Sequence, residues 1–243
     1  MKTLGIIPSR YASTRFPGKP LVQIDGKSMI QRVYEQSSLS KSLDQVVVAT
    51  DDVRIAEEVK RFGGSYIMTS DTHQSGTDRC AEVVAQLKGY DHVINIQGDE
   101  PYINPEQIDL LASCFQEKNV QLATLVKVIT SQEELINTNT PKVVLNAAGE
   151  ALYFSRQTIP HIRSSPEKDW LKAHIFYKHI GIYGYTTTAL NEITQLPSSS
   201  LERAENLEQL RWLENGYRIQ TKITTLETLA IDTPDDLNRI FKS

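Results

Sequence analysis

The chain has 243 residues and a formal net charge of −4, and 40% of its residues are hydrophobic. This length suits one α/β domain, with or without a small added lobe, and the composition is that of an ordinary globular protein. The negative net charge argues against a general nucleic-acid-binding protein, which needs a basic surface, although a local group of cations would suffice for a small anionic ligand.

The cysteines and the apolar runs indicate in which cellular compartment the protein lies. Cys80 and Cys114 lack the spacing of metal ligands and fall in helix-like segments, which predicts buried thiols in a reducing compartment. Met1-Lys2 leads directly into a short strand-like run, and no apolar run approaches membrane-spanning length. We therefore expect a cytoplasmic protein with neither a membrane nor a nucleic acid as its partner.

The first half of the chain alternates between strand-like and helical patterns. Near-continuous β-branched runs over 3–7, 45–50 and 92–97 predict strands that are buried on both faces, as in a parallel sheet; the first of them breaks at Pro8. Helices are predicted to begin after caps at Ser28, Asp52 and Asn104, the last with Gln107 completing a capping box. This alternation predicts a doubly wound, mostly parallel sheet.

A basic loop follows the first strand. Arg10, Arg15 and Lys19 lie between that strand and the next helix, and no acidic residue precedes Asp25. Guanidinium and ammonium groups, together with loop N–H donors, are suited to holding phosphates. The alternative is a solvated surface loop with scattered cations.

A second loop, over 71–79, precedes a predicted helix. Ser75, Gly76 and Thr77 offer hydroxyl and N–H groups to a nucleotide. The alternative is an ordinary helix cap with a glycine turn.

Carboxylates follow two apolar runs. Asp99 comes directly after Gly98 at the end of the third strand, where ligands of doubly wound sheets gather, and Asp232 comes just before a helix start at Thr233-Pro234. Mg²⁺ prefers one or two carboxylates together with phosphate oxygens, so both residues are candidate metal ligands. The alternative for Asp99 is a simple turn before a proline.

The second half of the chain changes character. A hairpin is predicted over 143–154, a polar loop over 162–169 and a strand over 177–185. A helix is predicted over 200–215, with Gly216 as its stop. This pattern indicates an antiparallel or mixed lobe within about 140–215, attached to the parallel sheet in a single unit spanning 1–243.

The polar residues of this half are weaker candidates. Arg156 follows the hairpin, and His179 lies within a strand, where a structural histidine is the alternative. Glu208, Gln209 and Arg211 lie on the last predicted helix, where the alternative is a solvated face. The sequence contains no nucleophile elbow, zinc-spaced Cys/His set or Walker motif, which favours direct phosphoryl or nucleotidyl transfer without a covalent enzyme intermediate.

Taken together, these segments resemble the 3-deoxy-manno-octulosonate cytidylyltransferase (CMP-Kdo synthetase) family. The resemblance covers nearly the whole chain and rests on motifs such as Ile-Pro-Ser-Arg-Tyr-Ala-Ser-Thr-Arg-Phe-Pro-Gly-Lys-Pro-Leu over 7–21 and His-Gln-Ser-Gly-Thr-Asp-Arg over 73–79. Further matching motifs are Asn-Ile-Gln-Gly-Asp-Glu-Pro over 95–101, Ala-Leu-Tyr-Phe-Ser-Arg-Gln-Thr-Ile-Pro over 151–160, Lys-His-Ile-Gly-Ile-Tyr-Gly-Tyr over 178–185, Leu-Glu-Gln-Leu-Arg over 207–211 and Asp-Thr-Pro-Asp-Asp-Leu over 232–237.

The resemblance implies a Rossmann-like nucleotidyltransferase domain, a homodimer, and Mg²⁺-dependent transfer of CMP from CTP to Kdo for lipopolysaccharide synthesis. By matching motifs it assigns CTP binding to Arg10, Ser13, Arg15, Lys19, Ser75 and Thr77. It assigns Mg²⁺ to Asp99 and Asp232, which together with Arg15 and Lys19 form the catalytic set. It assigns the Kdo pocket to Gln97, Arg156, His179, Tyr183, Glu208 and Gln209.

Two other functions stay open at this point. One is a nucleotidyltransferase for a related sugar, such as 8-amino-Kdo, sialic acid or an aldose phosphate, because a few pocket substitutions change selectivity. The other is a non-catalytic nucleotide-sugar sensor on the same fold.

Overall fold

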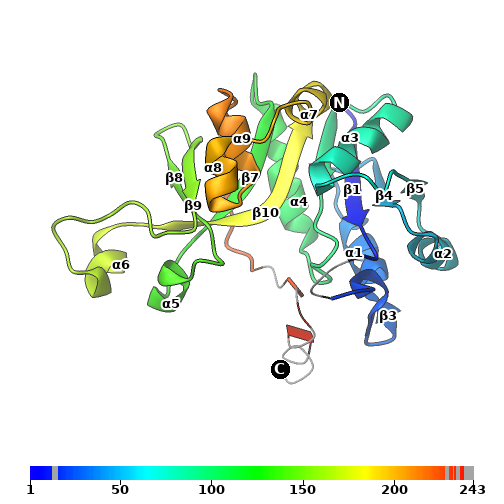
Figure 1. Cartoon of the computed structure of the whole chain (residues 1–243), viewed down its shortest axis with the longest axis horizontal. Coiled ribbons are helices and arrows are strands. Elements are labelled where there is room, and N and C mark those ends of the chain that lie inside the picture. The colour runs from blue at the N-terminus through cyan, green and yellow to red at the C-terminus, as the bar shows by residue number, and fades with distance from the viewer. Residues whose placement is uncertain (13–15, 228–229, 232, 234–235, 238–243) are drawn as a thin grey trace.

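The computed structural model describes residues 1–12, 16–227, 230–231, 233 and 236–237. Its centre is a nine-stranded sheet in which the main run of strands has the order β11-β7-β10-β6-β1-β4-β5 (Figure 1). All strands of this run are mutually parallel except β10, which is antiparallel to both of its neighbours. The strands are β1 (Thr3–Ser9), β4 (Gln45–Thr50), β5 (Tyr66–Met68), β6 (His92–Asn95), β7 (Leu122–Val128), β10 (Tyr177–Thr186) and β11 (Ile219–Ile223).

Helices cover both faces of this sheet. One face packs its apolar residues against α3 (Gly76–Gln86), α7 (Thr187–Ile193) and α9 (Gln209–Glu214). The other face packs against α1 (Met29–Ser37), α2 (Val53–Arg61) and α4 (Pro105–Ala112). The caps predicted at Ser28, Asp52 and Asn104 are confirmed, because each side chain accepts a hydrogen bond from the first turn of its helix. The doubly wound α/β fold is thus confirmed.

Two details of the predicted elements are wrong. The strand β1 does not break at Pro8 but continues to Ser9; pairing with β6 ends at Ile6, so the proline lies where β1 has a strand partner on one side only. Gln107 does not complete a capping box, because its buried amide points to the Leu226 carbonyl, 3.5 Å away.

The antiparallel lobe extends to one side of the sheet (Figure 1). Its strands β8 (Lys142–Leu145) and β9 (Ala151–Ser155) form the predicted hairpin, and β8 also pairs with the first residues of β10. The helices α5 (Gln132–Ile136) and α6 (Trp170–Ala173) lie at its outer end, with the single-turn η3 (Glu167–Asp169) inside the predicted loop. A separate small apolar cluster holds this end together, built from Ile129, Leu135, Trp170 and Phe176.

The long helix predicted over 200–215 is in fact two helices, α8 (Ser200–Glu205) and α9, which is a correction. Asn206 adopts the left-handed conformation with a φ of 52° and ends α8. The second helix folds back on the first, so that the guanidinium of Arg211 contacts the carboxylate of Glu202. Asparagine tolerates this conformation better than most residues, so it permits the break.

The remaining short elements are η1 (Lys19–Leu21), the ribbon β2 (Gln23–Ile24) and β3 (Lys27–Ser28), and η2 (Ser113–Gln116). Both cysteines are buried, as predicted, and burial raises the pKa of the Cys114 thiol to about 11. Within the described part of the chain, no helix combines the length and the apolar character that crossing a membrane requires.

Candidate active site

The chain reverses its direction of strand addition at β1. From β1 it adds β4 and then β5 on one side, and it then crosses to add β6 on the other side. In open α/β sheets, ligands bind beyond the carboxyl ends of the strands at such a switch point. A cavity of about 440 Å³ lies there, lined by Pro8, Ser9, Arg10, Ala12, Lys19, Pro20, Gly76, Gln97, Gly98 and Asp99.

An ion pair lies at the rim of this cavity. The Nζ atom of Lys19 is 2.8 Å from the Asp99 carboxylate, and the two side chains are 16% and 24% exposed. The turn that carries Lys19 closes through Gly18, whose N–H donates to the Tyr11 carbonyl and whose φ of 71° favours glycine. The structure therefore brings together a cation and a carboxylate that lie far apart in the sequence, a pairing that the sequence did not predict.

Arg10 is held against the second predicted loop. Its guanidinium donates hydrogen bonds to the carbonyls of His73 at 3.1 Å and Gln74 at 2.8 Å. The next residue, Ser75, caps α3 and forms a reciprocal capping box with Asp78. The alternative of an ordinary helix cap at Ser75 thus describes its contacts correctly, while the role of its hydroxyl toward CTP stays a prediction.

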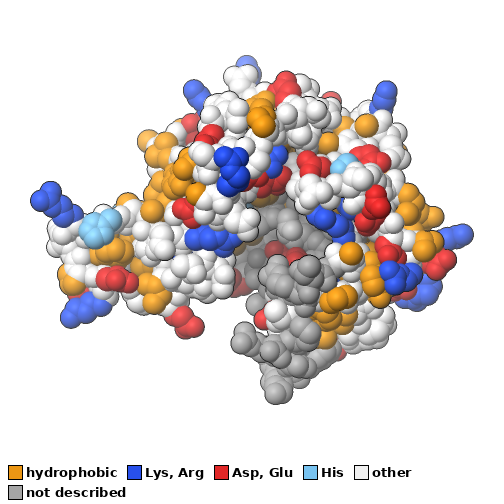
Figure 2. Space-filling view, viewed as in Figure 1, with side chains coloured by type: hydrophobic (Ala, Val, Ile, Leu, Met, Phe, Trp, Pro, Cys, Tyr) orange, Lys and Arg blue, Asp and Glu red, His pale blue; other side chains and the backbone are white. Residues whose placement is uncertain are grey.

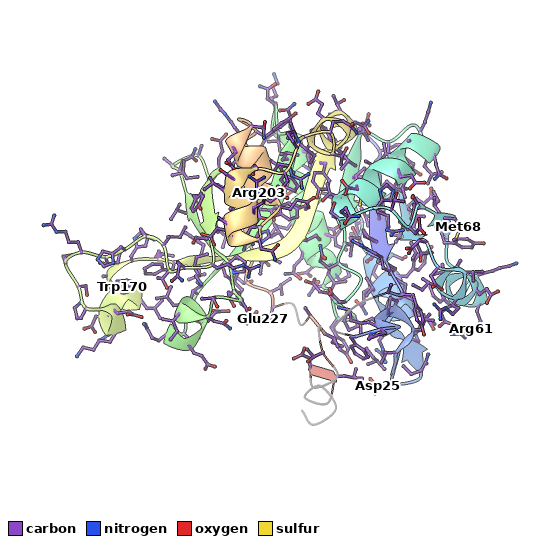
Figure 3. All side chains as sticks on the ribbon, in the orientation of Figure 1. Asp25, Arg61, Met68, Trp170, Arg203 and Glu227 are labelled. Atoms are coloured by element: carbon purple, nitrogen blue, oxygen red, sulfur yellow. The ribbon has the colours of Figure 1, made fainter. Side chains whose placement is uncertain are left out.

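Three predicted residues, Ser13, Arg15 and Asp232, lie outside the described part of the chain. The segment that leads to Asp232 is nevertheless anchored beside Asp99, because the Ile231 N–H donates to the Asp99 carbonyl at 2.9 Å. Further back in this segment, the carboxylate of Glu227, labelled in Figure 3, pairs with the ammonium groups of Lys127 and Lys178. Among the described residues there is no group of three or more Asp, Glu, His or Cys side chains that could hold a metal ion.

Glu100, next to Asp99, was not singled out from the sequence. It is 6% exposed, and its Oε2 has no hydrogen-bond partner among the described residues. Burial, and secondarily the Asp99 charge, raises the pKa of Glu100 to about 8, so this carboxyl group is mostly protonated at neutral pH. Its effect is to limit the negative charge at this strand end.

A second group of polar residues lies along β10. The Gln97 amide donates to the Gly181 carbonyl at 2.7 Å, which joins the cavity to the strand that carries His179 and Tyr183. The Thr124 hydroxyl donates to the Ile182 carbonyl at 2.7 Å and therefore accepts from Nε2 of His179, 3.0 Å away. Nδ1 is thus the acceptor of this ring.

Burial determines the protonation of this group. It lowers the pKa of His179 to about 3, so the imidazole is neutral across the physiological range. The side chains of Tyr183 and Gln209 are also buried, and both Tyr183 Oη and Gln209 Nε2 have no hydrogen-bond partner among the described residues. Buried polar groups without partners are few in folded proteins, so these atoms are suited to contacting a polar ligand.

The alternative interpretation of the last helix, a solvated face, is wrong for Gln209 and for Glu208. Glu208 lies at the start of α9 and accepts a hydrogen bond from the Thr77 hydroxyl at 2.7 Å. Burial raises the pKa of the Glu208 carboxyl, although its hydrogen bond from Thr77 acts in the opposite direction. This contact joins the start of α3 to the start of α9, which places a predicted nucleotide residue against a predicted sugar residue.

Arg156 lies at the end of β9, as predicted, but its guanidinium is used within the protein. It donates to the carbonyls of Glu205 at 2.7 Å, Thr138 at 3.2 Å and Asn206 at 3.2 Å. These contacts tie the hairpin to the connection between α8 and α9. Its role toward the sugar stays a prediction.

Figure 2 shows that this face of the molecule is hollowed between the antiparallel lobe and the parallel part, with charged side chains at the rim. Sequence reasoning missed Ser9, which lines the cavity, and Thr124, which sets the tautomer of His179. Both lie inside strands whose residues are nearly all buried, so their sequence pattern contains no alternation that marks a functional position.

A doubly wound fold with a basic, carboxylate-containing cavity at its switch point is typical of nucleotide-binding enzymes, and comparison with known proteins specifies the class. The family model described as cytidylyltransferase matches residues 4–223. The chain is 59% identical to the 3-deoxy-manno-octulosonate cytidylyltransferase of Parabacteroides distasonis, with 98% of this chain and 96% of the relative covered. It is 58% identical to the enzyme of that name from Cytophaga hutchinsonii, with 98% and 95% covered.

The fold agrees with these relatives. The solved structure of CMP:2-keto-3-deoxy-manno-octonic acid synthetase complexed with CTP superposes with a TM-score of 0.92 at 42% identity, covering 99% of this chain and 97% of that chain. The chain belongs to the 3-deoxy-manno-octulosonate cytidylyltransferase family, and the protein is therefore a nucleotidyltransferase.

Proposed function

We propose that the cavity between β1 and β6 binds CTP, and that the protein transfers its CMP group to Kdo in one step. The anomeric oxygen of Kdo forms a bond to the α-phosphorus while the bond from that phosphorus to the β-phosphate oxygen breaks in line. The products are CMP-Kdo and pyrophosphate, and the proton of the anomeric hydroxyl is released. The observation that supports this most directly is the meeting of Arg10, Lys19 and Asp99 in one switch-point cavity.

The chain's own cations act on the triphosphate. Lys19 lines the cavity, and its positive charge opposes the negative charge that develops on the leaving pyrophosphate. We assign the same role to Arg15. Arg10 is positioned by the carbonyls of the 73–74 loop and faces the same cavity. Together they supply positive charge for the bound triphosphate. No other described residue in the cavity lining is a cation.

We assign Mg²⁺ to Asp99 and Asp232. The donor chemistry fits, because hard carboxylate oxygens are the ligands that Mg²⁺ accepts from proteins alongside phosphate oxygens. The Ile231 N–H donates to the Asp99 carbonyl at 2.9 Å, so the residue before Asp232 in the sequence contacts Asp99. When bound, the metal would supply charge stabilisation at the α-phosphate and a lower pKa for the attacking hydroxyl.

We assign the sugar to the group along β10 and α9. Neutral His179 accepts a sugar hydroxyl at Nδ1, while Tyr183, Gln209 and Gln97 supply amide and hydroxyl groups. We place Glu208 in the same pocket, and Arg156 near the Kdo carboxylate.

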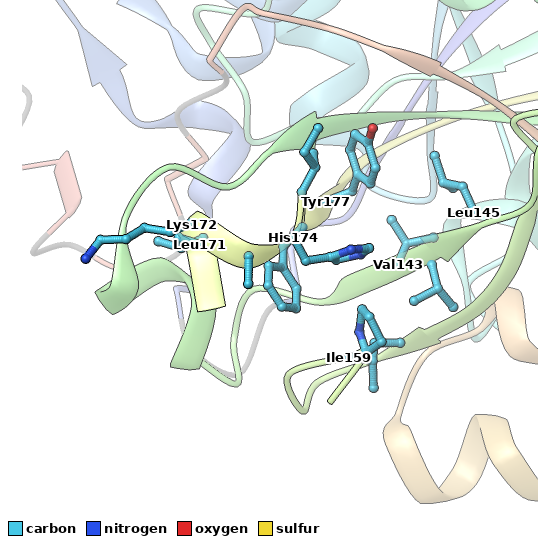
Figure 4. A pocket seen from close by; sticks show the side chains of 12 residues that line it. Val143, Leu145, Ile159, Leu171, Lys172, His174 and Tyr177 are labelled. Atoms are coloured by element: carbon cyan, nitrogen blue, oxygen red, sulfur yellow. The ribbon is translucent and has the colours of Figure 1, made fainter. Parts of the chain in front are cut away.

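We further propose a cytoplasmic homodimer that is formed through the antiparallel lobe. This lobe carries an apolar cavity of about 650 Å³ between β8, the 159–160 turn and the start of β10 (Figure 4). Exposed apolar side chains lie on the same lobe, among them Ile136 at 52%, Leu152 at 59% and Ile175 at 59%. Covering such side chains with a second copy would remove apolar surface from water.

A pyrophosphate-release assay with CTP, Mg²⁺ and a panel of sugar acids tests the function. We expect release with Kdo and the loss of release when Mg²⁺ is chelated. Release with sialic acid or 8-amino-Kdo alone would instead show a related transferase. The absence of pyrophosphate release with every sugar tested would favour a nucleotide-sugar sensor.

A further inference from the structure

One buried hydroxyl in the candidate CTP cavity is not used by the function described so far. Ser9 is the last residue of β1, is 3% exposed, and lines the cavity with its neighbours Pro8 and Arg10. Its Oγ atom has no hydrogen-bond partner among the described residues. Leaving a buried hydroxyl unpaired costs about 1–3 kcal/mol.

The other polar side chains that line this cavity differ from Ser9 in this respect. Arg10 donates to two loop carbonyls, Lys19 pairs with Asp99, and the Gln97 amide donates to the Gly181 carbonyl. The hydroxyl of Ser9 therefore keeps both its donor and its acceptor capacity, whereas these neighbours are already engaged within the protein.

Ser9 and Gly98 lie next to each other in the lining of the cavity. Gly98 faces Ser9 across the seam between β1 and the residues that follow β6, and a Cβ atom at Gly98 would lie 3.1 Å from Ser9 Oγ and 2.9 Å from the Pro8 carbonyl oxygen. Glycine at position 98 thus keeps side-chain atoms out of the space in front of the hydroxyl. The cations that line the same cavity make it a site for anionic or oxygen-rich groups.

We propose that the hydroxyl of Ser9 donates a hydrogen bond to an oxygen of the bound nucleotide, which makes Ser9 a further substrate-binding residue of this enzyme. The proposal rests on the assignment of CTP to this cavity. It also accounts for the buried unpaired hydroxyl, because ligand binding supplies the missing partner.

The test is isothermal titration of the full-length wild-type protein and Ser9→Ala with CTP in the absence of Kdo, so that no turnover occurs. We expect Ser9→Ala to bind CTP about tenfold more weakly. Titrations with cytidine and with inorganic triphosphate separate the two sources of the acceptor oxygen. A loss shared with triphosphate assigns the contact to a phosphate, and a loss shared with cytidine assigns it to the nucleoside part.

A thermal unfolding scan without ligand distinguishes this role from a structural one. Removing an unpaired buried hydroxyl should leave the melting temperature unchanged or raise it. The matched control is Ser37→Ala in α1, where the buried hydroxyl donates to the Val33 carbonyl at 2.7 Å. This control should lose stability and keep wild-type affinity for CTP.

Two results would overturn the proposal: an unchanged affinity of Ser9→Ala for CTP, or a melting temperature of unliganded Ser9→Ala lowered by more than about 3 °C. Failure of the proposed function is a separate outcome, because the wild-type protein itself would then not bind CTP.

Discussion

At the scale of single residues, the Lys19–Asp99 pair and His179 have opposite electrostatic tasks. Lys19 and Asp99 form an ion pair at the rim of a cavity, where each remains partly exposed to solvent. His179 lies deeper among aromatic rings and is held neutral by burial. The charged groups suit contact with phosphates and a metal ion, whereas a neutral ring suits a sugar hydroxyl.

The first prediction concerns Asp99→Asn. We expect the rate of pyrophosphate release to fall at least ~100-fold, by comparison with the loss of other single electrostatic groups in active sites. The fold should stay intact, as measured by thermal unfolding. The control is Asp109→Asn, whose carboxylate accepts hydrogen bonds from the Ser40 hydroxyl and the Ser42 N–H; it should change stability but not turnover. A near-normal rate of pyrophosphate release in Asp99→Asn would contradict the assignment of Mg²⁺ to Asp99.

The second prediction concerns the pH dependence that His179 causes. Its folded pKa of about 3 lies below its unfolded value of 6.5, so only the unfolded chain binds this proton between those values. The free energy of unfolding therefore falls as the pH drops through this window. Between pH 7.5 and pH 5 the wild-type protein should lose up to about 2 kcal/mol more than His179→Gln, measured by urea unfolding. Equal losses in both proteins would contradict the assigned burial effect.

At the scale of elements, the site depends on how strand and helix ends meet. The seam where the chain after β6 passes Pro8 of β1 favours glycine at position 98, because a Cβ atom there would lie 2.9 Å from the Pro8 carbonyl oxygen. The starts of α3 and α9 meet through the hydrogen bond from Thr77 to Glu208. Both contacts connect segments that are distant in the sequence.

The third prediction is that Gly98→Ala distorts this seam. We expect a loss of about 1–3 kcal/mol in the free energy of unfolding and weaker binding of CTP by titration. Gly181→Ala is the comparison for stability, since a Cβ atom there would make only an ordinary contact of 3.9 Å with Gln97. Comparable stability in the two variants would show that the seam can relax.

The fourth prediction is that Thr77→Val destabilises the junction of α3 and α9. The buried Glu208 carboxyl loses its hydroxyl donor, which costs about 1–3 kcal/mol in urea unfolding, and the KM for Kdo should rise. Thr188→Val, at an exposed position of α7, is the control and should match the wild-type protein in both measurements. An unchanged KM for Kdo would separate Glu208 from the sugar pocket.

At the scale of the whole molecule, the antiparallel lobe extends away from the parallel sheet and exposes apolar side chains (Figure 1). A protein of this size leaves few such side chains clustered on one projection unless a partner covers them. The proposed homodimer places a second copy there.

The fifth prediction follows from that proposal. Light scattering after size exclusion should give twice the chain mass of 27.4 kDa for the wild-type protein and a single chain mass for Ile175→Lys. The control is Met68→Lys, which changes an exposed apolar residue of β5 on the far side of the molecule from the lobe (Figure 3). A monomeric wild-type protein would refute the homodimer.

Local patterns in the sequence were sufficient to predict much of this protein. The caps at Ser28, Asp52 and Asn104, the buried strands and the hairpin depend on interactions within a few residues, so propensity and periodicity reveal them. The resemblance of several motifs was sufficient to identify the family. The break at Asn206 escaped this reasoning, because the apolar pattern continues across it and the fold-back is stabilised by a contact with Glu202 that only the folded chain makes.

Only the tertiary structure decided how the site is assembled. The sequence by itself determined that Lys19, Asp99, His179 and Glu208 were candidates, but not that Lys19 pairs with Asp99 or that Thr77 bonds to Glu208. Nor did it determine the burial that keeps His179 neutral or leaves the Ser9 hydroxyl unpaired. The physical reason is that burial and pairing are properties of surfaces that come together on folding, whereas helix caps and buried runs are properties of neighbouring residues in the chain.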